Sequence, residues 1–69
     1  MESTSYYAIE VIGYGAKARY VIKEIVCCLG QFCYASAISR PLRSEASARS
    51  EASAMGIEIA RVGQFYQII

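Results

Sequence analysis

The chain has 69 residues, 55% of them hydrophobic, and seven lysines and arginines against six acidic residues give a formal net charge of +1. A chain of this length forms one domain, and charge so near neutral gives no global attraction to nucleic acid or to a membrane surface. The chain contains no histidine, which excludes imidazole bases, imidazole metal ligands and a Ser-His-Asp triad. We therefore expect no enzyme, no metal site and no cofactor.

The apolar content is higher than one small core needs, and we expect a homodimer or a higher homo-oligomer. The three cysteines include the adjacent Cys27 and Cys28. This is a poor disulfide framework and predicts buried free thiols in a reducing cytoplasm. The first residues show no signal-peptide pattern, and the longest uncharged stretch, 25–39, is too short to span a bilayer. A cytoplasmic protein without membrane contact is expected.

The first half of the chain predicts a strand followed by a helix. Residues 5–12 are rich in β-branched and aromatic residues, stop at Gly13 and predict a strand. Residues 16–29 predict a helix, because apolar residues recur at a helical spacing. This stripe consists of Ala18, Ile22, Ile25 and Leu29. Gly30 would end the helix.

The middle of the chain predicts a second strand and a second helix. Residues 31–38 fit either a continued helix or a strand, and their aromatic residues favour the strand. Ser39 can cap a following helix, with Pro41 in its first turn. The hexapeptide RSEASA occurs twice, at 43–48 and 49–54, and favours this helix.

Two local signals support the second helix. Glu45 and Arg49 form an i, i+4 pair in the favourable order. Gly56 is a suitable C-terminal stop. Alternation of apolar and polar residues then predicts a strand within residues 57–69.

The predicted fold class is therefore α+β, a two-layer β-α-β-α-β arrangement with a short mixed sheet. A second interpretation is an all-α helical hairpin. Apolar residues from position 48 to position 69 keep a 4-3 spacing, so one helix from Pro41 onwards could pair with the first helix. Against it, Gly56 and Gly63 would each cost about 1 kcal/mol inside a helix.

The stretch IGYGAKARYV, residues 12–21, has three interpretations. Residues 13–18 fit the pattern G-x-G-x-x-A of a dinucleotide loop, which would make the protein an anion- or nucleotide-binding module. The stretch also fits a simple turn in which Lys17 and Arg19 are solvated. The third interpretation comes from a family resemblance.

Three short sequence segments, in the same order along the chain, resemble segments of the Alba family of small nucleic-acid-binding proteins. They are IG followed by YV within residues 12–21, AISR at 37–40 and IEIARVGQ at 57–64. The match spans most of the chain, although the family's C-terminal hairpin arm and fourth strand have no counterpart in these 69 residues. The resemblance implies an Alba-like fold and a non-catalytic dimer that binds the backbone of DNA or RNA.

The resemblance also implies which residues bind. Cations near the starts of the two predicted helices would converge on phosphates, and an aromatic residue in the loop could stack on a base. These candidates are Lys17, Arg19, Arg40, Arg43 and Tyr14. The alternative function is a self-assembling structural or adaptor protein without nucleic-acid binding, in which QFYQII, residues 64–69, supplies the interface.

Overall fold

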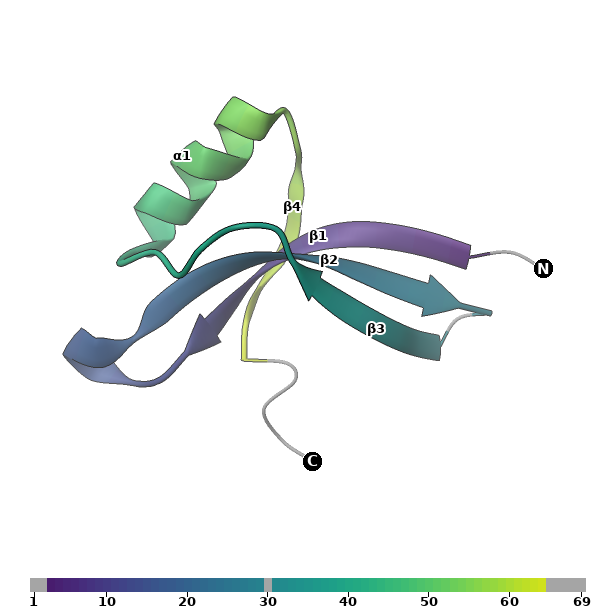
Figure 1. Ribbon diagram of the computed structural model, residues 1–69, viewed down its shortest axis with the longest axis horizontal. Coiled ribbons are helices and arrows are strands. Elements are labelled where there is room, and N and C mark those ends of the chain that lie inside the picture. Colours follow the sequence, from purple (N-terminus) through teal and green to yellow (C-terminus); the bar gives the residue numbers. More distant parts are fainter. Residues whose placement is uncertain (1–2, 30, 65–69) are drawn as a thin grey trace.

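Four strands and one α-helix make up the described part of the chain, residues 3–29 and 31–64, in the computed structural model shown in Figure 1. In chain order the elements are β1 (Ser3–Ile12), a short 3-10 helix η1 (Gly15–Lys17), β2 (Arg19–Cys28), β3 (Gln31–Ala37), α1 (Glu45–Met55) and β4 (Ile59–Gly63). The predicted α+β class is confirmed. The predicted order β-α-β-α-β is wrong, because a strand stands where the first helix was expected.

The four strands form one mixed sheet in the order β3-β2-β1-β4. Strands β1 and β2 pair antiparallel along their full length, from Ser3 opposite Cys28 to Ile12 opposite Arg19. Strand β3 pairs antiparallel with β2 on the far side. Strand β4 pairs parallel with β1, and α1 provides the crossover that a parallel pair requires. The mixed sheet is thus as predicted.

The helix predicted over residues 16–29 is a strand for a reason visible in the burial pattern. The neighbouring residues Val21 and Ile22 are both buried, at 4% and 0% exposure, so each face of β2 contributes to the interior. A β-branched run of this kind suits a pleated strand. The proposed helical stripe would have buried Leu29, which is 74% exposed. The proposed stop of this helix, Gly30, lies outside the described residues.

Helix α1 is closed at both ends by local interactions. The Ser44 hydroxyl accepts a hydrogen bond from the Ser47 N–H at 3.0 Å and caps the N-terminus. Gly56, in the left-handed conformation with φ of 75°, ends the helix as predicted. The predicted start is wrong, since Ser39 and Pro41 precede the helix by several residues and lie in an extended connection.

One face of α1 packs on the sheet, and two alanines let it approach closely (Figure 1). Ala48 and Ala52 lie one turn apart and are 0% and 2% exposed. They belong to the core cluster with Ile9, Ile22 and Leu42. On the outer face, Arg49 Nε donates to Glu45 Oε2 at 2.8 Å, which confirms the predicted i, i+4 pair.

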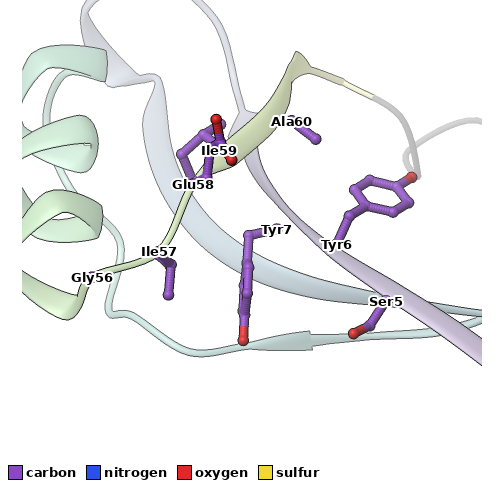
Figure 2. A pocket seen from close by; sticks show the side chains of 8 residues that line it. All are labelled: Ser5, Tyr6, Tyr7, Gly56, Ile57, Glu58, Ile59 and Ala60. Atoms are coloured by element: carbon purple, nitrogen blue, oxygen red, sulfur yellow. The ribbon is translucent and has the colours of Figure 1, made fainter.

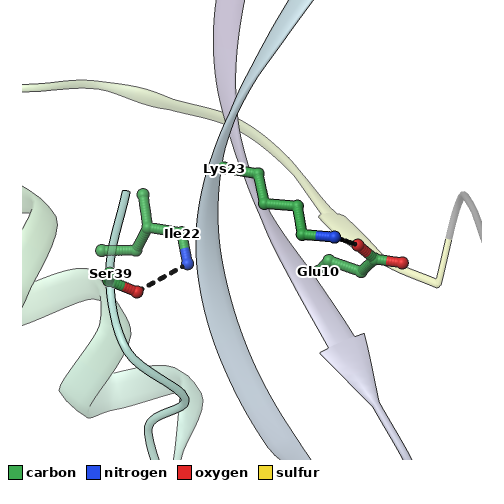
Figure 3. Close-up of polar contacts among 4 residues, drawn as sticks. All are labelled: Glu10, Ile22, Lys23 and Ser39. Atoms are coloured by element: carbon green, nitrogen blue, oxygen red, sulfur yellow. Dashed lines mark hydrogen bonds and ion pairs between the residues drawn. The ribbon is translucent and has the colours of Figure 1, made fainter. Parts of the chain in front are cut away.

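An ion pair lies on the sheet itself. The Lys23 ammonium on β2 donates to the Glu10 carboxylate on β1 (Figure 3). The Glu10 side chain is only 4% exposed and that of Lys23 is 21% exposed. A buried carboxylate needs such a partner, because an isolated charge in a low-dielectric interior is strongly disfavoured.

The cysteines differ from the prediction of free thiols. Cys27 is a free, half-buried cysteine, whereas Cys28 is disulfide-bonded. The prediction of a free thiol is confirmed for Cys27 and is wrong for Cys28.

Strand β4 decides between the two predicted fold classes. Residues Ile59–Gly63 form a strand after the turn at Gly56, so the all-α helical hairpin is wrong. Within QFYQII, only Gln64 is described, and the predicted interface at residues 65–69 lies outside the described residues.

Candidate functional site

The stretch IGYGAKARYV is the turn of the β1–β2 hairpin. Gly13 and Gly15 have φ of +87° and +61°, a left-handed conformation that glycine adopts without a Cβ penalty. Hydrogen bonds from Lys17 N to Tyr14 O and from Ala18 N to Gly15 O, at 3.2 and 3.1 Å, close the turn. No α-helix follows, so the dinucleotide-loop interpretation is wrong.

The hairpin turn presents two of the predicted residues to solvent. Tyr14 is 78% exposed between the two glycines, and Lys17 is exposed at the end of η1. On the opposite side, the Gln64 side-chain amide donates to the Gly13 carbonyl at 3.2 Å and ties the end of β4 to the turn. These hydrogen bonds therefore fix the backbone of the turn that carries the two exposed side chains.

Arg19 begins β2 directly after the turn. Its guanidinium Nη1 donates to the Ala18 carbonyl at 2.9 Å, and the residue is half-buried. This single contact leaves most of the guanidinium donors unused. Lys17 and Arg19 were predicted to lie near the start of a helix, which is wrong, and instead they flank the base of a hairpin turn.

The connection from β3 to α1 returns to this same end of the sheet. Tyr20 and Leu42 exchange two backbone hydrogen bonds, each 2.8 Å long, in an isolated antiparallel bridge. Since the bridge is antiparallel, Arg43 lies beside the start of β2, where Arg19 is. Leu42 is 9% exposed and anchors the connection in the core.

A second anchor fixes Arg40. The Ser39 hydroxyl accepts from the Ile22 N–H at 3.0 Å, as Figure 3 shows. The same hydroxyl donates to the Arg40 carbonyl at 2.9 Å. The Ile38 N–H also donates to the Ile22 carbonyl at 2.9 Å. Arg40 therefore leaves the sheet from a fixed backbone, and its side chain is exposed.

By these contacts Lys17 and Arg19 flank the turn and Arg43 lies beside Arg19, whereas Arg40 lies next to Ile22, three residues further along β2. We call these four cations the cationic patch. In the described residues none of the four is in an ion pair, because Glu10 is paired with Lys23 and Glu45 with Arg49. A protein of net charge +1 therefore carries a local excess of positive charge along the hairpin half of β2.

Sequence reasoning missed the residues that create this patch. Leu42 was not singled out, and Ser39 was assigned to a helix cap. The hairpin itself had a signal in the sequence, namely two β-branched runs separated by a short segment with two glycines.

An open groove lies at the other end of β1, away from the hairpin turn (Figure 2). It has a volume of about 660 Å³ and lies where the segment that leads into β4 meets β1, beside the register shift between Tyr7 and Ala8. Its lining consists of Ser5, Tyr6, Tyr7, Gly56, Ile57, Glu58, Ile59 and Ala60. This lining offers one carboxylate and no cation, so it does not suit a phosphate.

Two absences concern the described residues only. No group of three or more His, Cys, Asp or Glu side chains lies close enough together there to hold a metal ion. Among the helices of that part of the chain, none has the length and apolar character needed to cross a membrane.

Comparison with known proteins found no match to this chain among protein-family models, curated proteins or solved structures.

Proposed function

We propose that the protein binds the phosphate backbone of DNA or RNA through the cationic patch, without catalysis and as a dimer. The observation that carries this proposal is the placement of four cations, none of them in an ion pair among the described residues, along the hairpin half of β2 in a nearly neutral chain. Condensed counterions are released when lysine and arginine neutralise phosphates, and this release drives binding to a nucleic-acid backbone.

The patch suits phosphates by its chemistry. Three of its four members are arginines, whose planar guanidinium can bond a phosphate through two parallel N–H donors. Lys17 adds a mobile point charge at the turn. Tyr14, exposed beside it, offers a ring on which an unpaired base can stack. Nothing in this set is arranged to distinguish base edges, so the proposed binding is independent of sequence.

The proposed function is the one that the resemblance to the Alba family implies. That resemblance depends only on the three sequence segments within residues 12–21, 37–40 and 57–64. The proposal differs from that expectation in the site, because a hairpin turn takes the place of the first helix. It keeps the predicted cytoplasmic location, which the free Cys27 supports and the disulfide at Cys28 opposes.

Fluorescence anisotropy with a labelled DNA duplex and a labelled single-stranded RNA, measured across a salt series, tests the proposal. If each of the four cations neutralises one phosphate, every subunit in contact with duplex DNA contributes about −3.6 to the slope of the logarithm of the affinity against the logarithm of salt concentration. For one bound subunit this slope weakens binding about a hundredfold between 50 and 200 mM salt. The two probes also establish which nucleic acid is preferred.

A pair of variants assigns the binding to the patch. Arg43→Gln should reduce the slope by about 0.9 for each bound subunit, the value for one lost phosphate contact. Arg49→Gln removes the same charge from α1, outside the patch, and should leave the slope unchanged. The double variant Lys17→Glu/Arg19→Glu should abolish binding. No binding at low salt, or a slope that responds equally to both single variants, would contradict the proposal.

A further inference from the structure

Strand β3 is an edge strand of the sheet formed by the described residues and has unusual chemistry for such a position. It is the first strand in the order β3-β2-β1-β4 and pairs with β2 on one side (Figure 1). The hydrogen bond from Ile38 N to Ile22 O shows which residues face β2. By the alternation of an antiparallel ladder, the backbone groups of Ala35 and Ala37 then point away from the sheet.

Natural edge strands are usually protected from pairing by charged residues or proline. The β3 sequence QFCYASA contains neither. The other edge strand of the described sheet, β4, carries the exposed Arg61, a charged residue of the kind that protects an edge. Of the two edge strands in the described sheet, β3 is therefore the one that contains neither a charged residue nor proline.

Two large apolar side chains are exposed on this edge, at equal distances along the chain on either side of Ser36. Tyr34 and Ile38 are 56% and 38% exposed, and both lie an even number of residues from Ser36. An antiparallel pair of β3 strands with its two-fold axis at Ser36 places Tyr34 opposite Ile38 of the partner subunit. Aromatic and β-branched side chains form favourable cross-strand pairs.

We propose that two copies of the chain associate through β3, antiparallel and with the two-fold axis at Ser36, into one continuous sheet. Ala35 and Ala37 supply the backbone hydrogen bonds, and the two Tyr34–Ile38 contacts cover the exposed apolar surface. The occupant of the edge is a second copy because the edge is neutral and matches itself under the two-fold rotation. This proposal deepens the dimeric state assumed under the proposed function by naming its interface.

The contact is short, and we expect a weak dimer that depends on protein concentration. Sedimentation velocity over a concentration series, without nucleic acid, measures it. Because no nucleic acid is present, failure of this proposal and failure of backbone binding are distinguishable.

Ser36 permits a sharp test, since its side chain is exposed and its replacement leaves the core intact. Ser36→Lys places two ammonium groups opposite each other at the axis, and Ser36→Glu does the same with two carboxylates. Each variant alone should dimerise about tenfold more weakly than the wild type or worse. An equimolar mixture should recover the dimer, because opposite charges then face each other. A folding defect would not be repaired by mixing.

Ser53→Lys, at an exposed position on α1, is the matched control and should dimerise like the wild type. Four results would each overturn the proposal. These are a wild type that stays monomeric at every concentration, a Ser36→Lys variant that dimerises normally, a mixture that does not recover, and a control that loses the dimer.

Discussion

The pair of Glu10 and Lys23 gives a quantitative test of what holds the sheet together. Lys23→Met keeps an unbranched apolar stem on β2 and removes the ammonium group that neutralises Glu10 (Figure 3). The Glu10 carboxylate, with its side chain 4% exposed, then has lost its counter-charge in the interior. We expect a large loss of stability.

The size of the loss follows from the burial of the two partners. Breaking a buried ion pair by removing one member costs about 3–5 kcal/mol, because an uncompensated charge stays in a poorly solvated site. The Lys23 side chain is 21% exposed, so some water reaches the pair and the value should lie near the lower limit, at about 3 kcal/mol. For a domain of this size a loss of this magnitude lowers the Tm by about 12–24 °C.

Urea unfolding followed by circular dichroism measures the free energy of unfolding for Lys23→Met and two comparison variants. Arg49→Met removes the cation of the exposed pair on α1, where the two side chains are 53% and 46% exposed, and should cost about 0.5 kcal/mol or less. The double variant Glu10→Leu/Lys23→Met removes both charges and should return close to wild-type stability. The reasoning is refuted if Lys23→Met costs no more than Arg49→Met.

Two other predictions concern α1 and the cysteines. Ala48→Leu inserts a branched side chain at a position of 0% exposure, where the helix meets the sheet, and should cost about 2 kcal/mol of stability. Ala46→Leu, at an exposed position on the same helix, should change stability by about 0.5 kcal/mol or less. Equal effects of the two variants in a thermal melt would mean that α1 does not pack by this face. Iodoacetamide should alkylate Cys27 of the denatured protein without reductant, and Cys28 only after reduction. Mass spectrometry measures the modification of each cysteine. Modification of Cys28 without reductant would contradict the disulfide.

Part of this fold could be predicted because the signals are local. Residues 5–12 and 31–38 were predicted as strands and correspond to β1 and β3, since β-branched and aromatic residues favour a pleated backbone whatever surrounds them. The end of α1 at Gly56 was predicted for a similar reason. Its backbone conformation, with φ of 75°, is one that glycine adopts at little cost.

The segment that became β2 shows where local signals were insufficient. Its apolar residues fit a helical period, and they equally fit a strand that is buried on both faces. The structure forms the strand because β1 and β3 pair with it on either side. Helix capping by Ser44 rather than Ser39 has a related cause, because Ser39 is occupied by its hydrogen bond to β2.

The positions of the candidate site residues likewise depend partly on the local sequence and partly on tertiary contacts. The sequence determined that Lys17 and Arg19 lie close together near a glycine turn, because neighbours in the chain cannot separate. Only the tertiary structure decided that Arg43 joins them, since its position depends on the bridge between Tyr20 and Leu42. That bridge forms between segments far apart in the chain, and it is stabilised by burial of Leu42 in a core that exists only once α1 and the sheet have packed together.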